Sequence, residues 1–124
     1  MGYEFSFVLF GLPKTTNSIN RAHWAVKAKE AQRWRQAVCA ATCGQRPTAP
    51  LAKARLVLTR HSATQPDPDG LCSTFKHVID GLIDAKVIEN DKYINIGMPH
   101  YRWEKSPRGK GFIKIEVKEI EEPC

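Results

Sequence analysis

The aspartates of this 124-residue chain constrain its interpretation most, because all five lie between positions 67 and 91. That segment contains two basic and six acidic side chains, a net charge of −4, whereas the whole chain carries +6. The rest of the chain therefore carries a net charge of +10. Clustered carboxylates bind hard divalent cations, and lysine and arginine bind phosphate groups. This charge pattern is typical of a metal-dependent enzyme that acts on nucleic acid.

Hydrophobic periodicity predicts a single α/β domain that spans residues 1–124. Alternating apolar and polar side chains predict strands at residues 3–10, 52–60, 93–96 and 112–120. The third of these strands could continue after Gly97 towards Trp103. Helical spacing predicts two main helices, at residues 21–42 and 71–85. We therefore expect an α+β sandwich in which two helices pack on a mixed sheet of about four to five strands.

The first predicted strand has an unusual second face. One face carries Phe5, Phe7 and Leu9 and is fully apolar. The opposite face includes Val8 and Phe10 and is only half polar. Since apolar side chains favour burial, we expect both faces of this strand to be covered by other elements.

The composition limits the class of protein. Hydrophobic residues make up 42% of the chain and charged residues 26%, which is ordinary for a globular domain. No apolar run approaches the roughly 18 residues of a membrane span. The N-terminus has no signal-peptide pattern. These features predict a cytoplasmic protein that has no membrane partner.

The strongest candidate for a metal site is a pair of aspartates, Asp67 and Asp69, on a proline-constrained loop that leads into a helix. Both carboxylates can point at one Mg²⁺ ion if a turn breaks the strict alternation of the loop. Asp91 can join them only if the following strand runs beside the preceding one. The cation would activate a water and neutralise charge on a scissile phosphate. An isolated D-x-D is more often a helix cap or a solvated pair, and this alternative stays open.

Lys76 lies one helical turn before Asp80, so the two side chains are expected to be neighbours. Lys76 could bind a phosphate, form a salt bridge with Asp80, or do both. Six residues are expected to contact DNA: Lys14, Asn17, Lys27, Arg33, Arg60 and Lys76. The alternative for the charges of the first helix is an ordinary solvated surface.

Several short patterns occur together along most of the chain. They are Leu12-Pro13 with Asn17, Trp24 at a helix start, the D-x-D of Asp67 and Asp69, Lys76-x-x-x-Asp80, and Asp91 eleven residues later. This combination resembles the RusA-type Holliday-junction resolvases, which are small crossover-junction endodeoxyribonucleases common in prophages. The K-x-x-x-D pattern with the later aspartate is its most specific part.

The resemblance implies a homodimeric, Mg²⁺-dependent nuclease, bacterial or phage-encoded, for which Mn²⁺ can substitute. Such an enzyme resolves four-way junctions in DNA recombination and repair by paired symmetric nicks. By resemblance, its catalytic and metal-binding carboxylates are Asp67, Asp69 and Asp91, its catalytic lysine is Lys76, and Asp80 is a supporting acidic position. The sequence departs from the family pattern at Gly70, where asparagine is frequent, and at Asn90, where a second aspartate is frequent.

Two other functions remain open from the sequence. The first is a DNA-binding protein without catalytic activity, in which the acidic loop is structural. The second is a nuclease of the same fold that cuts flaps, forks or other branched DNA. DNA cleavage in the presence of Mg²⁺ would distinguish the predicted resolvase from the first alternative. Comparing the cleavage of four-way junctions with that of other branched DNA would distinguish it from the second.

Overall fold

The computed structural model describes residues 3–13 and 24–120. Four strands form one mixed sheet in the order β1-β4-β2-β3, in which only β2 and β3 are parallel. The strands are β1 (Glu4–Phe10), β2 (Ala54–Ser62), β3 (His100–Lys105) and β4 (Phe112–Glu119). This arrangement confirms the predicted α+β class, with two main helices packed on a mixed sheet.

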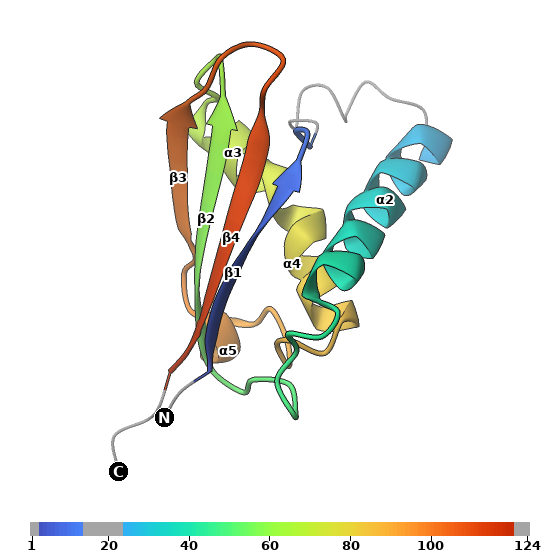
Figure 1. The fold of residues 1–124 in the computed structure, drawn as a ribbon, viewed down its shortest axis with the longest axis vertical. Helices are drawn as coiled ribbons and strands as arrows, with labels where there is room; N and C mark the ends of the chain where they lie inside the picture. The colour runs from blue at the N-terminus through green and yellow to red at the C-terminus, as the bar shows by residue number, and fades with distance from the viewer. Residues whose placement is uncertain (1–2, 14–23, 121–124) are drawn as a thin grey trace.

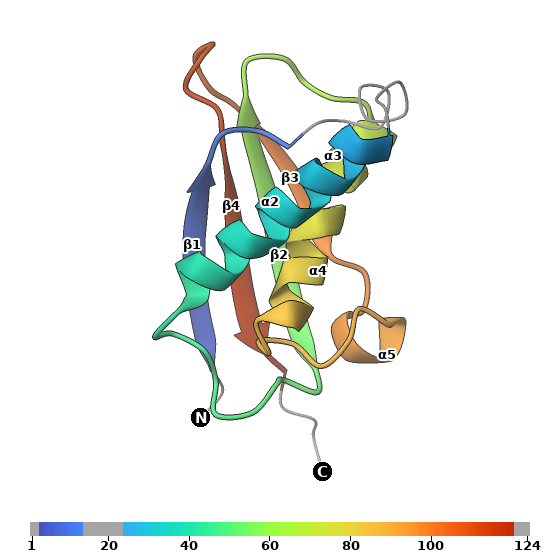
Figure 2. The same ribbon diagram turned by 90° about the vertical axis from the view of Figure 1, so that its right-hand side faces the viewer.

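Both main helices lie on the same face of the sheet (Figure 1; Figure 2). They are α2 (Trp24–Thr42) and α4 (Lys76–Asp84), and they pack against each other. Gly81 of α4 permits this close approach, because a Cβ atom at that position would lie 2.8 Å from the Cβ of Val38. Two shorter helices, α3 (Pro68–Thr74) and α5 (Tyr93–Ile96), lie towards opposite ends of the sheet (Figure 1).

The core lies between the sheet and the two main helices. Alternate residues of the central strands, such as Leu56 and Ile115, are fully buried on the helix-covered face. Trp34 of α2 is also buried, and its indole Nε1 donates to Glu30 Oε1 at 2.9 Å. These buried positions follow the period-two alternation of side chains that predicted both strands. Within the described residues, no helix combines the length and apolar character needed to cross a membrane.

The helix predicted at 71–85 is interrupted and begins earlier than expected. The chain forms α3 from Pro68 and then α4 from Lys76, with a bend at Phe75. Asp67 caps α3, and proline is favoured in the first helical turn, so the helix starts at the D-x-D itself. The bend accompanies complete burial of the Phe75 ring, whose centroid lies 6.0 Å from that of Tyr101.

The strand predicted at 93–96 is wrong, because this segment forms the short helix α5. A strand would place Ile94 and Ile96 on one face, whereas the helix buries Ile96 and leaves Ile94 exposed. The side chain of Asn95 donates to the backbone oxygen of Ala52 at 2.9 Å and fixes α5 beside the start of β2. Gly97 ends the helix with a positive φ, and the predicted continuation towards Trp103 is β3.

The expectation that both faces of the first strand are covered is also wrong. Phe7 and Leu9 are buried beneath the helices. On the opposite face, Val8 is 37% exposed and Phe10 is 83% exposed. The helices cover one side of the sheet only, so a half-polar strand face remains open (Figure 1).

Candidate functional site

The predicted acidic pair lies at the start of α3, after the segment that connects it to β2. Asp67 is the N-cap of α3, and its Oδ1 accepts a hydrogen bond from Gly70 N at 2.7 Å. Asp69 lies in the first turn of the same helix, and both aspartates are exposed. The free N–H groups at a helix N-terminus stabilise nearby negative charge. Both acidic positions are therefore favourable for the start of α3, and the hydrogen bond to Gly70 confirms the capping alternative for Asp67.

Arg60 holds this turn in place from the interior. It is only 8% exposed, and its Nη1 donates to Pro13 O and to Thr74 Oγ1, both at 3.0 Å. Thr74 Oγ1 in turn donates to Gly70 O at 2.8 Å. This network joins the segment after β1 to the turn that contains Asp67. The role of Thr74 was missed from the sequence, because a single threonine in a helix carries no signal.

The surroundings of Arg60 are unusual for an arginine. Burial lowers the pKa of its guanidinium. Its Nε has no hydrogen-bond partner, and no carboxylate pairs with it in the described part of the chain. The predicted contact of Arg60 with DNA would need an exposed guanidinium. The structure therefore supports a positioning role for Arg60 beside the acidic pair.

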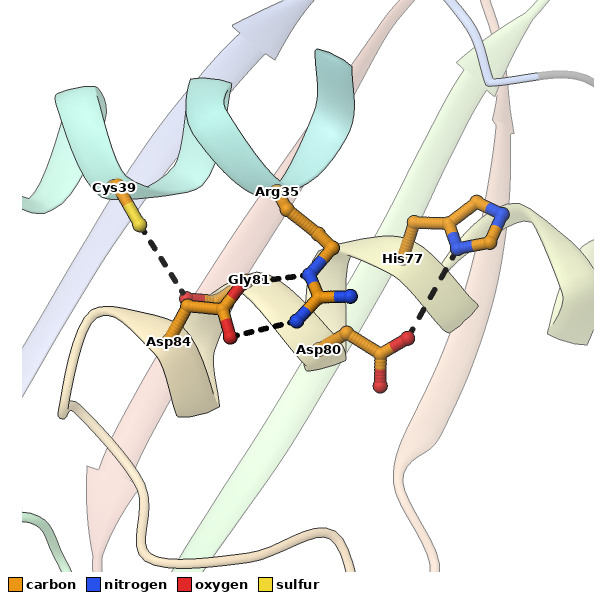
Figure 3. Close-up of polar contacts among 6 residues, drawn as sticks. All are labelled: Arg35, Cys39, His77, Asp80, Gly81 and Asp84. Atoms are coloured by element: carbon orange, nitrogen blue, oxygen red, sulfur yellow. Dashed lines mark hydrogen bonds and ion pairs between the residues drawn. The ribbon is translucent and has the colours of Figure 1, made fainter. Parts of the chain in front are cut away.

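Lys76 is exposed in the first turn of α4, directly after α3. It does not pair with Asp80 within the described residues. Instead, the Asp80 carboxylate lies 3.9 Å from Nδ1 of His77 (Figure 3). The side chain of Lys76 is therefore available for another anion, such as a phosphate group.

Asp84 has a structural partner. Arg35 of α2 donates to both of its carboxylate oxygens, at 2.6 and 2.8 Å (Figure 3). This hydrogen-bonded pair lowers the pKa of the Asp84 carboxyl and raises the pKa of Arg35. The bridge joins α2 to α4, so Asp84 contributes to helix packing.

Asp91 lies at the other end of the sheet from the acidic pair. Ile88 forms a parallel bridge with Leu51, and Glu89 N donates to Leu51 O at 3.0 Å, so this segment lies beside the start of β2. β2 is nine residues long. Its two ends are therefore roughly 25 Å apart. β3 does run parallel to β2, but it begins only at His100, after α5.

One chain therefore does not bring Asp91 to Asp67 and Asp69. Among the side chains of residues 3–13 and 24–120, no group of three or more His, Cys, Asp or Glu is placed to hold a metal ion. The acidic pair alone remains as a candidate ligand set. Mg²⁺ is usually bound through one or two carboxylates, with water and substrate phosphates as further ligands, so the donor chemistry of the pair fits this ion.

Four DNA contacts were predicted in addition to Arg60 and Lys76. Lys14 and Asn17 lie outside the described residues. Lys27 is half-buried and Arg33 is exposed, both on α2. The Arg33 guanidinium lies over the Trp34 ring, 5.2 Å from its centroid, and points towards Gly11 after β1. Arg33 and Lys76 therefore provide exposed positive charge towards the end of the sheet that carries Asp67.

Comparison with protein-family models found no match, and comparison with curated proteins found no significant similarity. The resemblance to the RusA-type resolvases therefore stays a prediction from the sequence patterns. The assignment of a function rests on the residues of this chain.

Proposed function

We propose that this protein is a divalent-metal-dependent endodeoxyribonuclease that cuts branched DNA, with the four-way junction as its main substrate. The observation that carries the proposal is the placement of Asp67 and Asp69, both exposed at the N-terminus of α3. Exposed Lys76 follows at the start of the next helix. The carboxylates at the start of α3 provide ligands for a cation, and the lysine just past its end provides a contact for the DNA phosphates.

The residues of the chain would have distinct tasks in this reaction. Asp67 and Asp69 would hold Mg²⁺, or Mn²⁺ in its place. The bound cation supplies an activated water and neutralises charge on the phosphate that is cut. Lys76 would bind a phosphate oxygen and orient the DNA backbone. Arg60 and Thr74 would keep the capped turn rigid, because the geometry of a metal site depends on groups that fix its ligands.

A homodimer fits this substrate. A four-way junction has approximate two-fold symmetry, and a symmetric dimer presents two equivalent sites to it. Paired symmetric nicks in recombination and repair would follow from that arrangement. Basic side chains of α2 would contact the backbone of the DNA, which fixes its register without reading its sequence.

The separation of Asp91 from the acidic pair favours a second candidate function. If Asp91 is essential to a metal site, then a single chain lacks a complete one. Without a second chain that supplies Asp91, the protein would bind branched DNA and not cut it, and the carboxylates of α3 would serve only as cap and helix-terminal charge.

Cleavage of a labelled four-way junction, with Mg²⁺ and with chelator, distinguishes these functions. We expect paired nicks that require Mg²⁺ and that disappear in Asp69→Asn, while junction binding in chelator is retained. The matched control is Glu89→Gln, because Glu89 is an exposed carboxylate beside the start of β2. This control should cut at the wild-type rate.

Unchanged cleavage by Asp69→Asn would refute the proposed metal site. Binding without cutting, with either Mg²⁺ or Mn²⁺, would establish the second function. A fork and a linear duplex, tested beside the junction, show whether the nuclease prefers four-way junctions or cuts branched DNA in general.

A further inference from the structure

The open face of the sheet carries a row of aromatic side chains at the end where β1 and β2 terminate. Strand register places Phe10 opposite Phe112, and Phe112 opposite His61. The rings of His61 and Phe112 are stacked, with centroids 4.1 Å apart and an interplanar angle of 13°. The ring centroids of Phe10 and Phe112 lie 6.4 Å apart. Phe10 is 83% exposed, so this row ends in a ring that almost nothing covers.

A groove of about 640 Å³ adjoins these rings. It is lined by Phe10, Gly11, Leu12, Gly109, Lys110, Gly111 and Phe112. Three of these residues are glycines, so a planar ligand can approach the backbone closely. A larger residue at Gly111 would displace the Leu12 side chain, because a Cβ atom there would lie 2.5 Å from Leu12 Cδ1.

Hydrogen bonds hold the walls of the groove in place. Gly11 N donates to Gly111 O at 3.0 Å and continues the pairing of β1 with β4. In the turn before β4, Ser106 Oγ donates to Lys110 O at 3.0 Å. Lys110 N donates to Pro107 O at the same distance. The groove is therefore largely preformed, which lowers the entropic cost of binding.

Positive charge surrounds the aromatic row. Lys110 lines the groove, and Arg108 precedes it in the same exposed turn. Thr59 lies two residues before His61 on the same face of β2. Strand register pairs it with Lys114 on one side and with Arg102 on the other. The carboxylate in the aromatic row, Glu104, lies 3.5 Å from Nδ1 of His61. The rim of the groove therefore carries an excess of positive charge.

We propose that this groove, together with Phe10 and Phe112, binds an unpaired segment of single-stranded DNA. A base would stack on the exposed ring of Phe10, beside the partly buried Phe112, while Lys110 and Lys114 contact the flanking phosphates. Aromatic rings combined with a cationic track are the general chemistry of single-strand binding. A second copy of the chain fits less well, because a two-fold axis through the groove would bring the two basic rims together.

This inference rests on the proposed function and extends it, because flaps and forks are branched DNA that contains unpaired nucleotides. The groove and the acidic pair lie at the same end of the sheet. Arg60 connects them, since it bonds Pro13, next to the groove-lining Leu12, and Thr74 of α3. Since α3 lies on the helix-covered side of the sheet, a strand held in the groove would reach Asp67 and Asp69 by passing around this end of the sheet.

The test measures anisotropy of a labelled oligothymidylate in chelator, so that no cutting is required. We expect Phe10→Ala to weaken single-strand binding by about ten-fold, with little change for a blunt duplex. Phe10→Trp keeps a stacking ring and should retain the wild-type affinity. The matched control is Ile94→Ala, because Ile94 is another exposed apolar side chain and lies on α5 at the far end of the sheet.

Several results would overturn the proposal: no binding of the oligonucleotide by the wild type, an equal loss in Ile94→Ala, or unchanged affinity in Phe10→Ala. Tighter binding of RNA than of DNA would also overturn it. If Phe10→Ala converts a dimer to a monomer in sedimentation, the groove is an interface between copies. Because binding is measured without metal, loss of junction cleavage and loss of single-strand binding are separate outcomes.

Discussion

At the scale of single residues, Asp67 has two separable tasks. Its carboxylate caps α3 through Gly70 N, and in the proposed function it also binds a metal ion. Asparagine caps helices about as well as aspartate but carries no charge. Substitutions at this position can therefore remove one task and keep the other.

We expect Asp67→Asn to retain the free energy of unfolding but to lose Mg²⁺-dependent cleavage. Asp67→Ala should lose both, with a stability cost of about 1 kcal/mol for the missing cap. Urea unfolding and junction cleavage, measured on both variants, check this expectation. A variant Asp67→Asn that cuts normally would show that this aspartate is a helix cap and nothing more.

At the scale of elements, the Arg35–Asp84 bridge connects α2 and α4 on their partly exposed side. The pKa of Asp84 is lowered in the folded protein, because Arg35 hydrogen-bonds its ionised form. The bridge therefore stabilises the fold above the ordinary carboxyl pKa of 3.8. This contribution is lost as the pH falls through the lowered folded-state value.

We expect Arg35→Gln to be less stable than the wild type near neutral pH. The difference should shrink as the pH falls below about 4, where Asp84 of the unfolded chain is protonated. Unfolding free energies measured from acid to neutral pH check this, and the effect should be modest because both side chains are partly exposed. A stability difference that does not vary with pH would show that Arg35 acts through packing and not through its charge.

The elements also show where sequence patterns are informative. Alternation of apolar and polar side chains predicted β2 and β4 and agrees with their buried faces, because side-chain direction in a strand depends on the local backbone alone. The same reasoning failed for the segment at 93–96, where Ile94 and Ile96 alternate but form α5. Four residues are too few to distinguish the two periods, and the contact of Asn95 with Ala52 is visible only in the fold.

At the scale of the whole molecule, the path of the chain separates Asp91 from the acidic pair. The segment from α3 to α4 returns the chain along β2, and its 17 residues span roughly 25 Å as helix. That length matches β2, so residues after α4 lie beside the start of the strand. If Asp91 takes part in catalysis, it must do so from a second chain.

A mixture of two inactive variants tests this arrangement. Each shared site would use Asp69 of one chain and Asp91 of the other. In a dimer of one Asp69→Asn chain and one Asp91→Asn chain, one site therefore carries both substitutions. The other site retains both natural aspartates. We therefore expect the mixed protein to regain junction cleavage that neither variant shows alone. The measurement is cleavage after refolding of an equimolar mixture, with mass spectrometry to confirm that mixed dimers form. Mixed dimers without activity would exclude a contribution of Asp91 across the interface.

Local sequence patterns were sufficient for the fold class, for the buried faces of β2 and β4 and for the position of the acidic pair. These properties depend on side-chain periodicity and on capping chemistry, which act over a few residues. Only the tertiary structure decided that Arg60 is buried beneath the acidic turn, that Asp91 lies far from it, and that one sheet face stays open. These properties depend on which surfaces pack together, since helix length and strand register jointly fix where distant residues meet.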